Sequence, residues 1–180
     1  PMHFSPDGKT LFFTDNDLGD PNLVMMDMDS GDVTILSEIF TDLWFDLNPA
    51  GDTLVFVKKI GHGTAIYSLP LDSGAAALRL SYETDPRNPV FSVDGSLVVY
   101  TAGDRFGSKN LYTIRPDGSG YKKVTTFNDP ADAVVPVGIT SPEPSVLYVM
   151  PSQTTKNQLE IWSITTDGSS DEFLAVCILE

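Results

Sequence analysis

Cysteine is almost absent from this sequence, and one residue, Cys177, is too few for a disulfide within the chain. The sequence also contains no Asn-x-Ser/Thr glycosylation site and no apolar run of about 18 residues or longer, so no membrane-spanning helix is predicted. The lack of disulfides and of glycosylation sites agrees with a bacterial or cytosolic origin. Both the periplasm and the cytoplasm remain open as the compartment.

Basic residues are scarce as well. Lys and Arg number 11 against 25 Asp and Glu, which gives a formal net charge of −14 and an isoelectric point near 4.2. Binding of nucleic acids and of anionic membranes depends on basic side chains, so neither is predicted as a partner. The acidity is typical of a soluble protein, and a preference for basic partners is the alternative interpretation.

Catalytic side chains are sparse. The two histidines, His3 and His62, lie in different repeats of the chain, and no Gly-x-Ser-x-Gly nucleophile elbow occurs. His3 stands beside Phe4 in an expected strand, which favours a structural role. His62 lies between two glycines, which is typical of a tight turn, and a ligand-contacting loop tip is the alternative. The sequence therefore favours a protein that is not itself an enzyme and needs no cofactor.

Two turn motifs recur along the whole chain. The first occurs at Ser5-Pro6-Asp7-Gly8, Asn48-Pro49-Ala50-Gly51, Ser92-Val93-Asp94-Gly95 and, in altered form, Ser141-Pro142-Glu143-Pro144. The second occurs at Asp29-Ser30-Gly31, Asp72-Ser73-Gly74, Pro116-Asp117-Gly118 and Thr166-Asp167-Gly168. The glycines of the first motif are 43 and 44 residues apart, and those of the second are 43, 44 and 50 apart. Two motifs with one period indicate a repeated structural unit, and a period of this length is typical of propeller blades.

Each repeat divides into four short strands. The first strand leads into the first turn motif, at His3–Ser5, Phe45–Leu47 and Val90–Ser92. An apolar run follows that turn, at Leu11–Phe13, Leu54–Val57, Leu97–Tyr100 and Val146–Val149. Such runs are typical of strands buried on both faces, an environment that a blade between two other blades provides. Two further strands flank the second motif, and no segment has a sustained helical period.

The sequence thus predicts an all-β protein, a β-propeller of four-stranded antiparallel blades. A single domain is expected over residues 1–180, with repeats at 1–37, 43–81, 86–125 and 134–176. One blade cannot bury both of its faces, so the stability of the repeats must come from stacking.

The repeat resembles that of the TolB-type propeller family. The resemblance rests on Phe-Ser-Pro-Asp-Gly-Lys, an apolar strand, a polar loop, an aliphatic-aromatic strand, Asp-x-Gly and a final Leu/Val-Ser/Thr. Phe4–Ser37 matches nearly completely, Leu43–Ser81 and Pro89–Thr125 match well, and Val137–Val176 matches loosely. The resemblance implies blades around a central channel, as in TolB and in the propeller domains of prolyl-oligopeptidase-like peptidases.

Propellers of this family usually have six or more blades, whereas four repeats are counted here. We expect part of a larger propeller; closure of four blades, or pairing of open faces between chains, are the alternatives. An open array would expose apolar blade faces and strand edges, which would allow self-association.

Candidate binding residues are expected in loops that converge on one face of the propeller, because loops on rigid scaffolds concentrate function. The loops between repeats, and between second and third strands, contain Asp42, Trp44, Lys58, Lys59, His62, Asp85, Arg87, Arg105, Phe106, Asp129 and Asp132. From these we select Trp44, His62, Arg87 and Arg105, since Trp and Arg are favoured at binding hot spots. Packing between blades for Trp44, and an ion pair at the rim for Arg87, are the structural alternatives.

The segment Asp15-Asn16-Asp17-Leu18-Gly19-Asp20 has oxygen ligands of the kind that bind Ca²⁺, with Asp15, Asp17 and Asp20 as weak metal-ligand candidates. It lacks the glycine and the bidentate glutamate of the calcium-loop pattern, so a hairpin turn without metal is the favoured prediction. Some pectate-degrading lyases resemble TolB in fold, but they use a cluster of metal-binding histidines that two separated histidines do not supply.

The predicted function is a non-enzymatic binding module for a protein or peptide at the channel face. The alternative is an accessory or gating propeller of a serine hydrolase whose catalytic domain is absent from this sequence. A metal-dependent lyase is less favoured.

Overall fold

The residues that the computed structural model describes form sixteen strands and no helix. Those residues are 2–15, 21–37, 44–72, 74, 76–103, 107–128, 133–140, 144–152, 154–155 and 158–178. The strands form four antiparallel sheets of four strands, each in chain order from one edge to the other. The predicted all-β fold with four-stranded units is confirmed.

The bounds of the strands follow the repeat. Sheet I contains β1 (Met2–Phe4), β2 (Thr10–Asp15), β3 (Asn22–Asp27) and β4 (Val33–Ser37). Sheet II contains β5 (Phe45–Leu47), β6 (Thr53–Ile60), β7 (Gly63–Pro70) and β8 (Leu78–Arg79). Sheet III contains β9 (Thr84–Phe91), β10 (Val98–Gly103), β11 (Lys109–Ile114) and β12 (Lys122–Lys123). Sheet IV contains β13 (Val135–Ile139), β14 (Ser145–Pro151), β15 (Gln158–Thr165) and β16 (Asp171–Ile178).

The first turn motif closes the hairpin between the first two strands of sheets I, II and III by local hydrogen bonds. The amide of Gly8 donates to the carbonyl of Ser5 over 2.9 Å, and the hydroxyl of Ser5 donates to Asp7 over 2.6 Å. Gly8 has a φ of 72°, a left-handed conformation that costs glycine little. Gly51 has a φ of 78° and also lies against Pro6 of sheet I, where a Cβ would overlap the proline ring. The turns therefore help to fix the spacing of sheets I and II.

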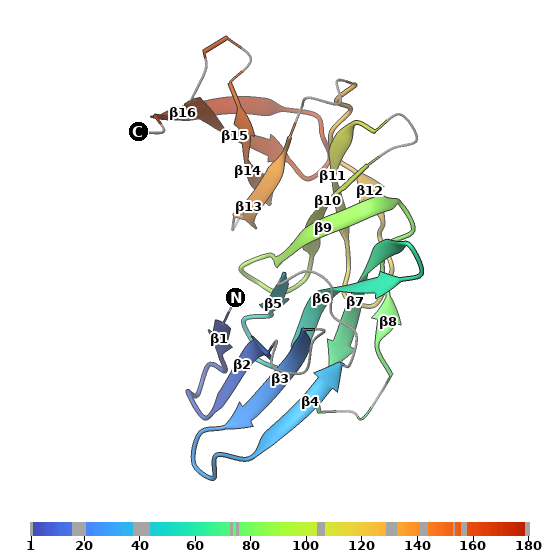
Figure 1. Ribbon diagram of the computed structural model, residues 1–180. Helices are drawn as coiled ribbons and strands as arrows, with labels where there is room; N and C mark the ends of the chain where they lie inside the picture. The colour runs from blue at the N-terminus through green and yellow to red at the C-terminus, as the bar shows by residue number, and fades with distance from the viewer. Residues whose placement is uncertain are drawn as a thin grey trace.

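The sheets stack in chain order through three apolar clusters. The cluster between sheets I and II includes Phe12, Leu23, Phe45, Leu54 and Phe56. The cluster between sheets II and III includes Val55, Val57, Ile66, Val98, Tyr100 and Tyr112. The cluster between sheets III and IV includes Val99, Leu111, Val146, Tyr148 and Ile164. Figure 1 shows the resulting arc, with the inner strands β1, β5, β9 and β13 around its open side.

The burial of the second strand of each sheet depends on how many neighbouring sheets pack against it. All six residues of β10 are buried, as are four successive residues of β6, Leu54–Val57. In contrast, β2 is mostly half-buried and β14 alternates between buried and half-buried positions. Burial on both faces is thus confirmed for the middle sheets and was wrong for the terminal ones, which pack against one neighbour each.

Candidate binding site at the channel face

Several residues expected in loops lie in strands instead. Lys58 and Lys59 belong to β6, because the hairpin to β7 narrows to a turn at Gly61 and His62. The inner strand β9 begins at Thr84, ahead of the short strand expected at Val90–Ser92. Asp85 and Arg87 therefore lie on an inner strand, where their backbone is held by sheet III.

The first half of β9 has an unusual backbone. Asp85 and Asn88 have φ values of 50° and 53°, and they are the non-glycine residues with positive φ in the described part of the chain. Each precedes a proline, which disfavours the right-handed helical region for the residue before it. Asp and Asn tolerate the left-handed region better than most residues. Left-handed non-glycine residues are strained and gather at functional sites, so this segment is a candidate on backbone grounds.

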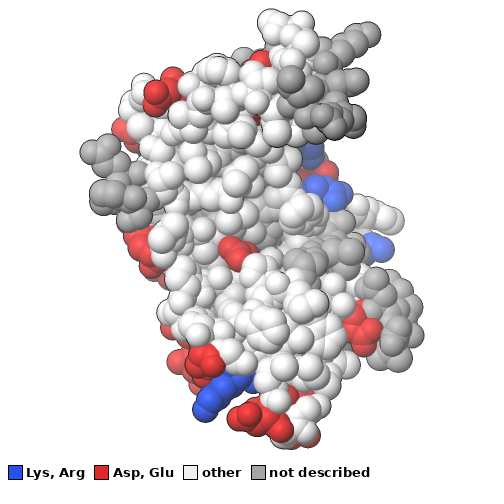
Figure 2. Space-filling model, turned by 90° about the vertical axis from the view of Figure 1, so that its left-hand side faces the viewer, with Lys and Arg blue, Asp and Glu red and all other residues white. Residues whose placement is uncertain are grey.

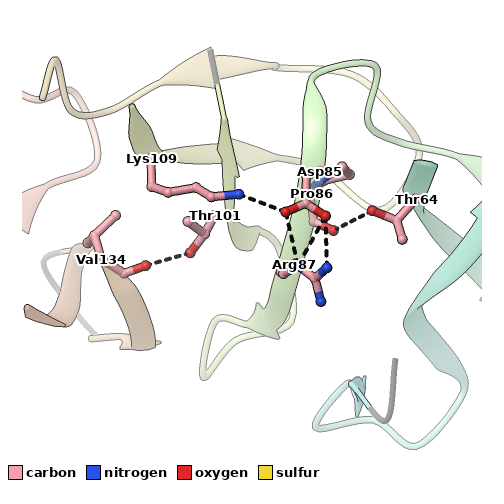
Figure 3. A network of polar contacts seen from close by, with 7 residues as sticks. All are labelled: Thr64, Asp85, Pro86, Arg87, Thr101, Lys109 and Val134. Atoms are coloured by element: carbon pink, nitrogen blue, oxygen red, sulfur yellow. Dashed lines mark hydrogen bonds and ion pairs between the residues drawn. The ribbon is translucent and has the colours of Figure 1, made fainter. Parts of the chain in front are cut away.

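The strained segment positions a small ion cluster, formed by Asp85, Arg87 and Lys109 (Figure 3). The Asp85 carboxylate accepts hydrogen bonds from Arg87 Nε at 3.1 and 3.2 Å, and Arg87 Nη2 lies 2.9 Å from it. The Nζ of Lys109, at the start of β11, donates to the same carboxylate over 2.8 Å. Two cationic side chains thus contact one carboxylate in this cluster.

The charge of Asp85 is stabilised by its partners. Partial burial on its own would raise the pKa of Asp85, but the hydrogen bonds from Arg87 and Lys109 together outweigh it, and the pKa lies below the usual value. The carboxylate of Asp85 therefore remains ionised at neutral pH.

Neighbouring sheets brace this segment. The hydroxyl of Thr64 in β7 donates to the carbonyl of Pro86 over 3.3 Å, and that of Thr101 in β10 donates to the carbonyl of Val134 over 3.0 Å (Figure 3). Gly103, at the end of β10, allows close approach, because a Cβ there would lie 3.2 Å from the carbonyl oxygen of Thr84. The bond from Thr64 thus ties the strained segment to sheet II, and the bond from Thr101 ties the adjacent strand β10 to the residue before β13.

A chain of polar contacts links the inner strands of sheets I, II and III. The Asp46 carboxylate in β5 accepts a hydrogen bond from the amide of Phe91 in β9 over 2.8 Å and lies 3.7 Å from Nδ1 of His3 in β1. The ring of His3 packs edge-on against Phe45 at 5.1 Å. Burial raises the pKa of Asp46 above its usual value, although the amide of Phe91 and His3 act in the opposite direction. This carboxylate therefore joins three sheets at the cost of partial dehydration.

A hollow of about 330 Å³ lies beside Asp46, between the inner strands of sheets II, III and IV. It is lined by Asp46, Leu47, Pro49, Val90, Phe91, Ser92, Val93, Val137, Gly138, Ile139, Thr140 and Leu147. Figure 2 shows the open side of the arc, where most of the surface is uncharged. Lys and Arg are visible mainly at its right-hand edge and its lower end.

The structure places the selected residues at separate points. Trp44 is half-exposed just before β5, and its carbonyl accepts a hydrogen bond from Val57. His62 is exposed at the β6–β7 turn, whereas Arg87 belongs to the ion cluster. Arg105 lies outside the described residues.

Of the weak metal candidates, Asp15 ends β2 opposite Asn22, and Asp17 and Asp20 lie outside the described residues. Within the described ranges, no group of three or more His, Cys, Asp or Glu side chains is placed to hold a metal ion. The same ranges contain no helix long and apolar enough to cross a membrane.

Sequence reasoning missed Lys109 and Asp46. Lys109 reaches Asp85 across 24 positions in the chain, so no local pattern indicates the pair. Asp46 had a weak signal, because it occupies the same register position before the turn motif as His3 in the first repeat.

Comparisons with known proteins give the fold a context. No protein-family model matches the sequence. An uncharacterized protein of Agrobacterium fabrum is 23% identical over 122 residues, which are 67% of this chain and 41% of that protein. This chain therefore spans less than half of that relative.

Solved structures match almost the whole chain. A TolB candidate from Agrobacterium tumefaciens superposes with a TM-score of 0.77 at 22% identity, over 98% of this chain and 65% of that one. TolB from Acinetobacter baumannii superposes with a TM-score of 0.67 at 20% identity, over 93% of this chain and 40% of that one. The β-propeller domain of the Trilobed protease from Pyrococcus furiosus superposes with a TM-score of 0.71 at 10% identity, over 97% of this chain and 56% of that one. The chain therefore has the TolB-type β-propeller fold.

Proposed function

We propose that this protein is a non-enzymatic binding module that holds an extended segment of a partner protein against the inner strands at the channel face. The observation that carries the proposal is the ion cluster, in which Asp85 and Arg87 of β9 contact Lys109 of β11, because β9 also lines the apolar hollow. Arg87 retains 41% of its side-chain exposure while Asp85 fixes its orientation, so its guanidinium is pre-organised for a ligand.

The spacing suits a short peptide. Val90, which lines the hollow, lies three residues after Arg87 on β9, and an irregularity in the pairing matches these three residues to two of β10, or about 7 Å along the strand. An extended ligand with an acidic residue at the ion cluster can therefore place an apolar side chain in the hollow two or three positions away. The guanidinium of Arg87 and the ammonium of Lys109 favour the acidic residue, and the apolar lining of the hollow favours the second contact.

Selection from a phage-displayed library of random peptides tests the proposal. Peptides that bind the wild-type chain are measured against the double variant Arg87→Gln/Lys109→Gln. The control, Lys122→Gln/Lys123→Gln, removes the same charge from exposed positions of β12. We expect the affinity of the selected peptides to fall about tenfold or more in the first variant and less than about twofold in the control. Equal losses in the two variants, or no selectable peptide, would contradict the proposal.

Self-association through the terminal sheets belongs to the same proposal. Sheet I exposes Met2 and Phe4, and β16 of sheet IV exposes Phe173, Leu174 and Val176. Large exposed apolar side chains of this kind favour association. Light scattering over a range of protein concentrations should detect species larger than 19.6 kDa, and a mass of one chain at every concentration would refute this part.

A gating propeller of a serine hydrolase is the second candidate, supported by the likeness in fold to the propeller domain of the Trilobed protease. It requires a catalytic domain with a Gly-x-Ser-x-Gly elbow in the same gene, and this sequence has none. The sequence flanking this chain in its gene decides between the two candidates.

A further inference from the structure

A second hollow, of about 270 Å³, lies between the outer parts of sheets II and III, away from the residues of the channel-face site. It is lined by Leu80, Tyr82, Glu83, Ile114, Gly118 and Tyr121. The first three belong to the connection from β8 to β9. The others lie at the end of β11 and in its connection to β12. The lining thus combines two tyrosines, a carboxylate and an aliphatic floor.

The tyrosines present open aromatic surface. Tyr82 is 76% exposed and Tyr121 is 53% exposed. Tyr121 stacks on Tyr112 at 5.9 Å, which fixes its ring against sheet III. The guanidinium of Arg79 lies 4.4 Å from the centre of the Tyr82 ring. The protein's own arginine therefore demonstrates that an aromatic ring at this position accepts a cation.

Glu83 supplies a fixed negative charge beside these rings. Its carboxylate accepts hydrogen bonds from the hydroxyl of Tyr100 over 3.2 Å and from the amide of Tyr82 over 3.0 Å. Burial and the charge of Glu83 raise the pKa of Tyr100, and burial and a hydrogen bond with Glu83 raise that of Tyr121, so both hydroxyls stay protonated. Within the described ranges, no Lys or Arg forms an ion pair with Glu83.

We propose that this hollow binds a lysine or arginine side chain of a partner protein. The aliphatic stem of such a side chain fits against Leu80 and Ile114, and its charged end reaches Glu83 and the ring faces of Tyr82 and Tyr121. The net charge of −14 attracts a basic partner over longer distances. This site is independent of the proposed channel-face function and gives the acidity of the chain a specific role.

Titration of the wild-type chain with the peptide acetyl-Gly-Gly-Arg-Gly-Gly-amide, followed by NMR, tests the proposal. We expect saturable shifts of the Tyr82 and Tyr121 ring signals, and none with the matched glutamine peptide. Glu83→Gln and Tyr82→Ala should each weaken binding about fivefold. The control Asp29→Asn removes one exposed negative charge elsewhere and should change binding less than about 1.5-fold. Because Tyr82 is largely exposed, Tyr82→Ala should fold normally.

Two further arms identify the ligand. Arg79→Gln removes a competing positive charge, so it should strengthen binding of the arginine peptide about twofold. Weaker binding would show that Arg79 supports the site and does not compete for it, and would overturn the proposal. Spermidine, titrated in parallel, should bind more weakly than the peptide, and tighter binding would assign the site to a free polyamine. Equal effects of Glu83→Gln and Asp29→Asn, or no saturable shifts in the wild-type chain, would also overturn it.

Discussion

The buried carboxylate of Asp46 makes a measurable prediction about stability and pH. Its pKa in the folded protein is raised above the usual 3.8, first because of burial, so the folded state favours the protonated side chain. A raised pKa contributes stability that is fully present below pH 3.8 and is lost as the pH rises through the folded-state pKa. Asp46→Asn mimics the protonated form at every pH and retains an oxygen that can accept from the amide of Phe91.

The loss of stability depends on whether the residue at position 46 can still accept the hydrogen bond from the amide of Phe91. Asp46→Ala leaves the buried amide of Phe91 without its acceptor, which should cost about 1–3 kcal/mol. Asp46→Asn keeps that bond, so it should be at least as stable as the wild type at neutral pH. Relative to Asp46→Asn, the wild type should gain stability as the pH falls from its folded-state pKa towards 3.8.

Urea unfolding of the three proteins, followed by tryptophan fluorescence between about pH 3.5 and 7, measures these differences. Subtraction of the Asp46→Asn curve cancels the pH dependence of the groups that do not interact with Asp46, and the same pair of curves in a His3→Gln background removes the contribution of His3. Two parallel curves for wild type and Asp46→Asn would refute the reasoning, as would an Asp46→Ala variant as stable as Asp46→Asn.

Three further predictions concern the repeat. Gly51→Ala should destabilise the protein by more than about 1 kcal/mol, because Gly51 has a positive φ and the added Cβ overlaps Pro6. Gly31 has a similar φ but open space around it, so Gly31→Ala should lower the free energy of unfolding by less in the same assay. Leu111 is buried between sheets III and IV, so Leu111→Ala should lower the free energy of unfolding by about 2–5 kcal/mol, whereas Leu78→Ala at a half-exposed position should lower it by less than about 1 kcal/mol. Equal losses of stability would contradict the stacking of these sheets. The hydrogen bonds from Ser92 and Ser96 lower the pKa of Asp94, so its contribution to stability is present above pH 3.8 and is lost as the pH falls through the lowered pKa. The difference in unfolding free energy between wild type and Asp94→Asn should therefore shrink in acid, and a difference that stays constant would contradict this prediction.

The sequence predicts what local chemistry determines. Ser5-Pro6-Asp7-Gly8 encodes its turn within four residues, and its recurrence locates the strands on either side. The early start of β9 escaped prediction, because Pro86 and Pro89 argue against a strand and left-handed φ values at Asp85 and Asn88 accommodate them only in the folded sheet.

The candidate sites depend on contacts between repeats, which the sequence alone does not specify. Arg87 was identified from its residue type, but its fixed orientation requires Asp85 and the distant Lys109. The partners of Asp46 lie in the first and third repeats. The half-burial of β2 and β14 likewise follows from the number of neighbouring sheets rather than from the apolar runs themselves.

Hydrogen–deuterium exchange of the wild-type chain, with and without a selected peptide, tests the proposed channel-face binding most directly. We predict that the peptide slows exchange in β9 (Thr84–Phe91) and β13 (Val135–Ile139), whose residues form the ion cluster and line the hollow. The Arg87→Gln/Lys109→Gln variant should lose this protection. Protection that spares both strands and appears elsewhere in the chain would contradict the proposed site.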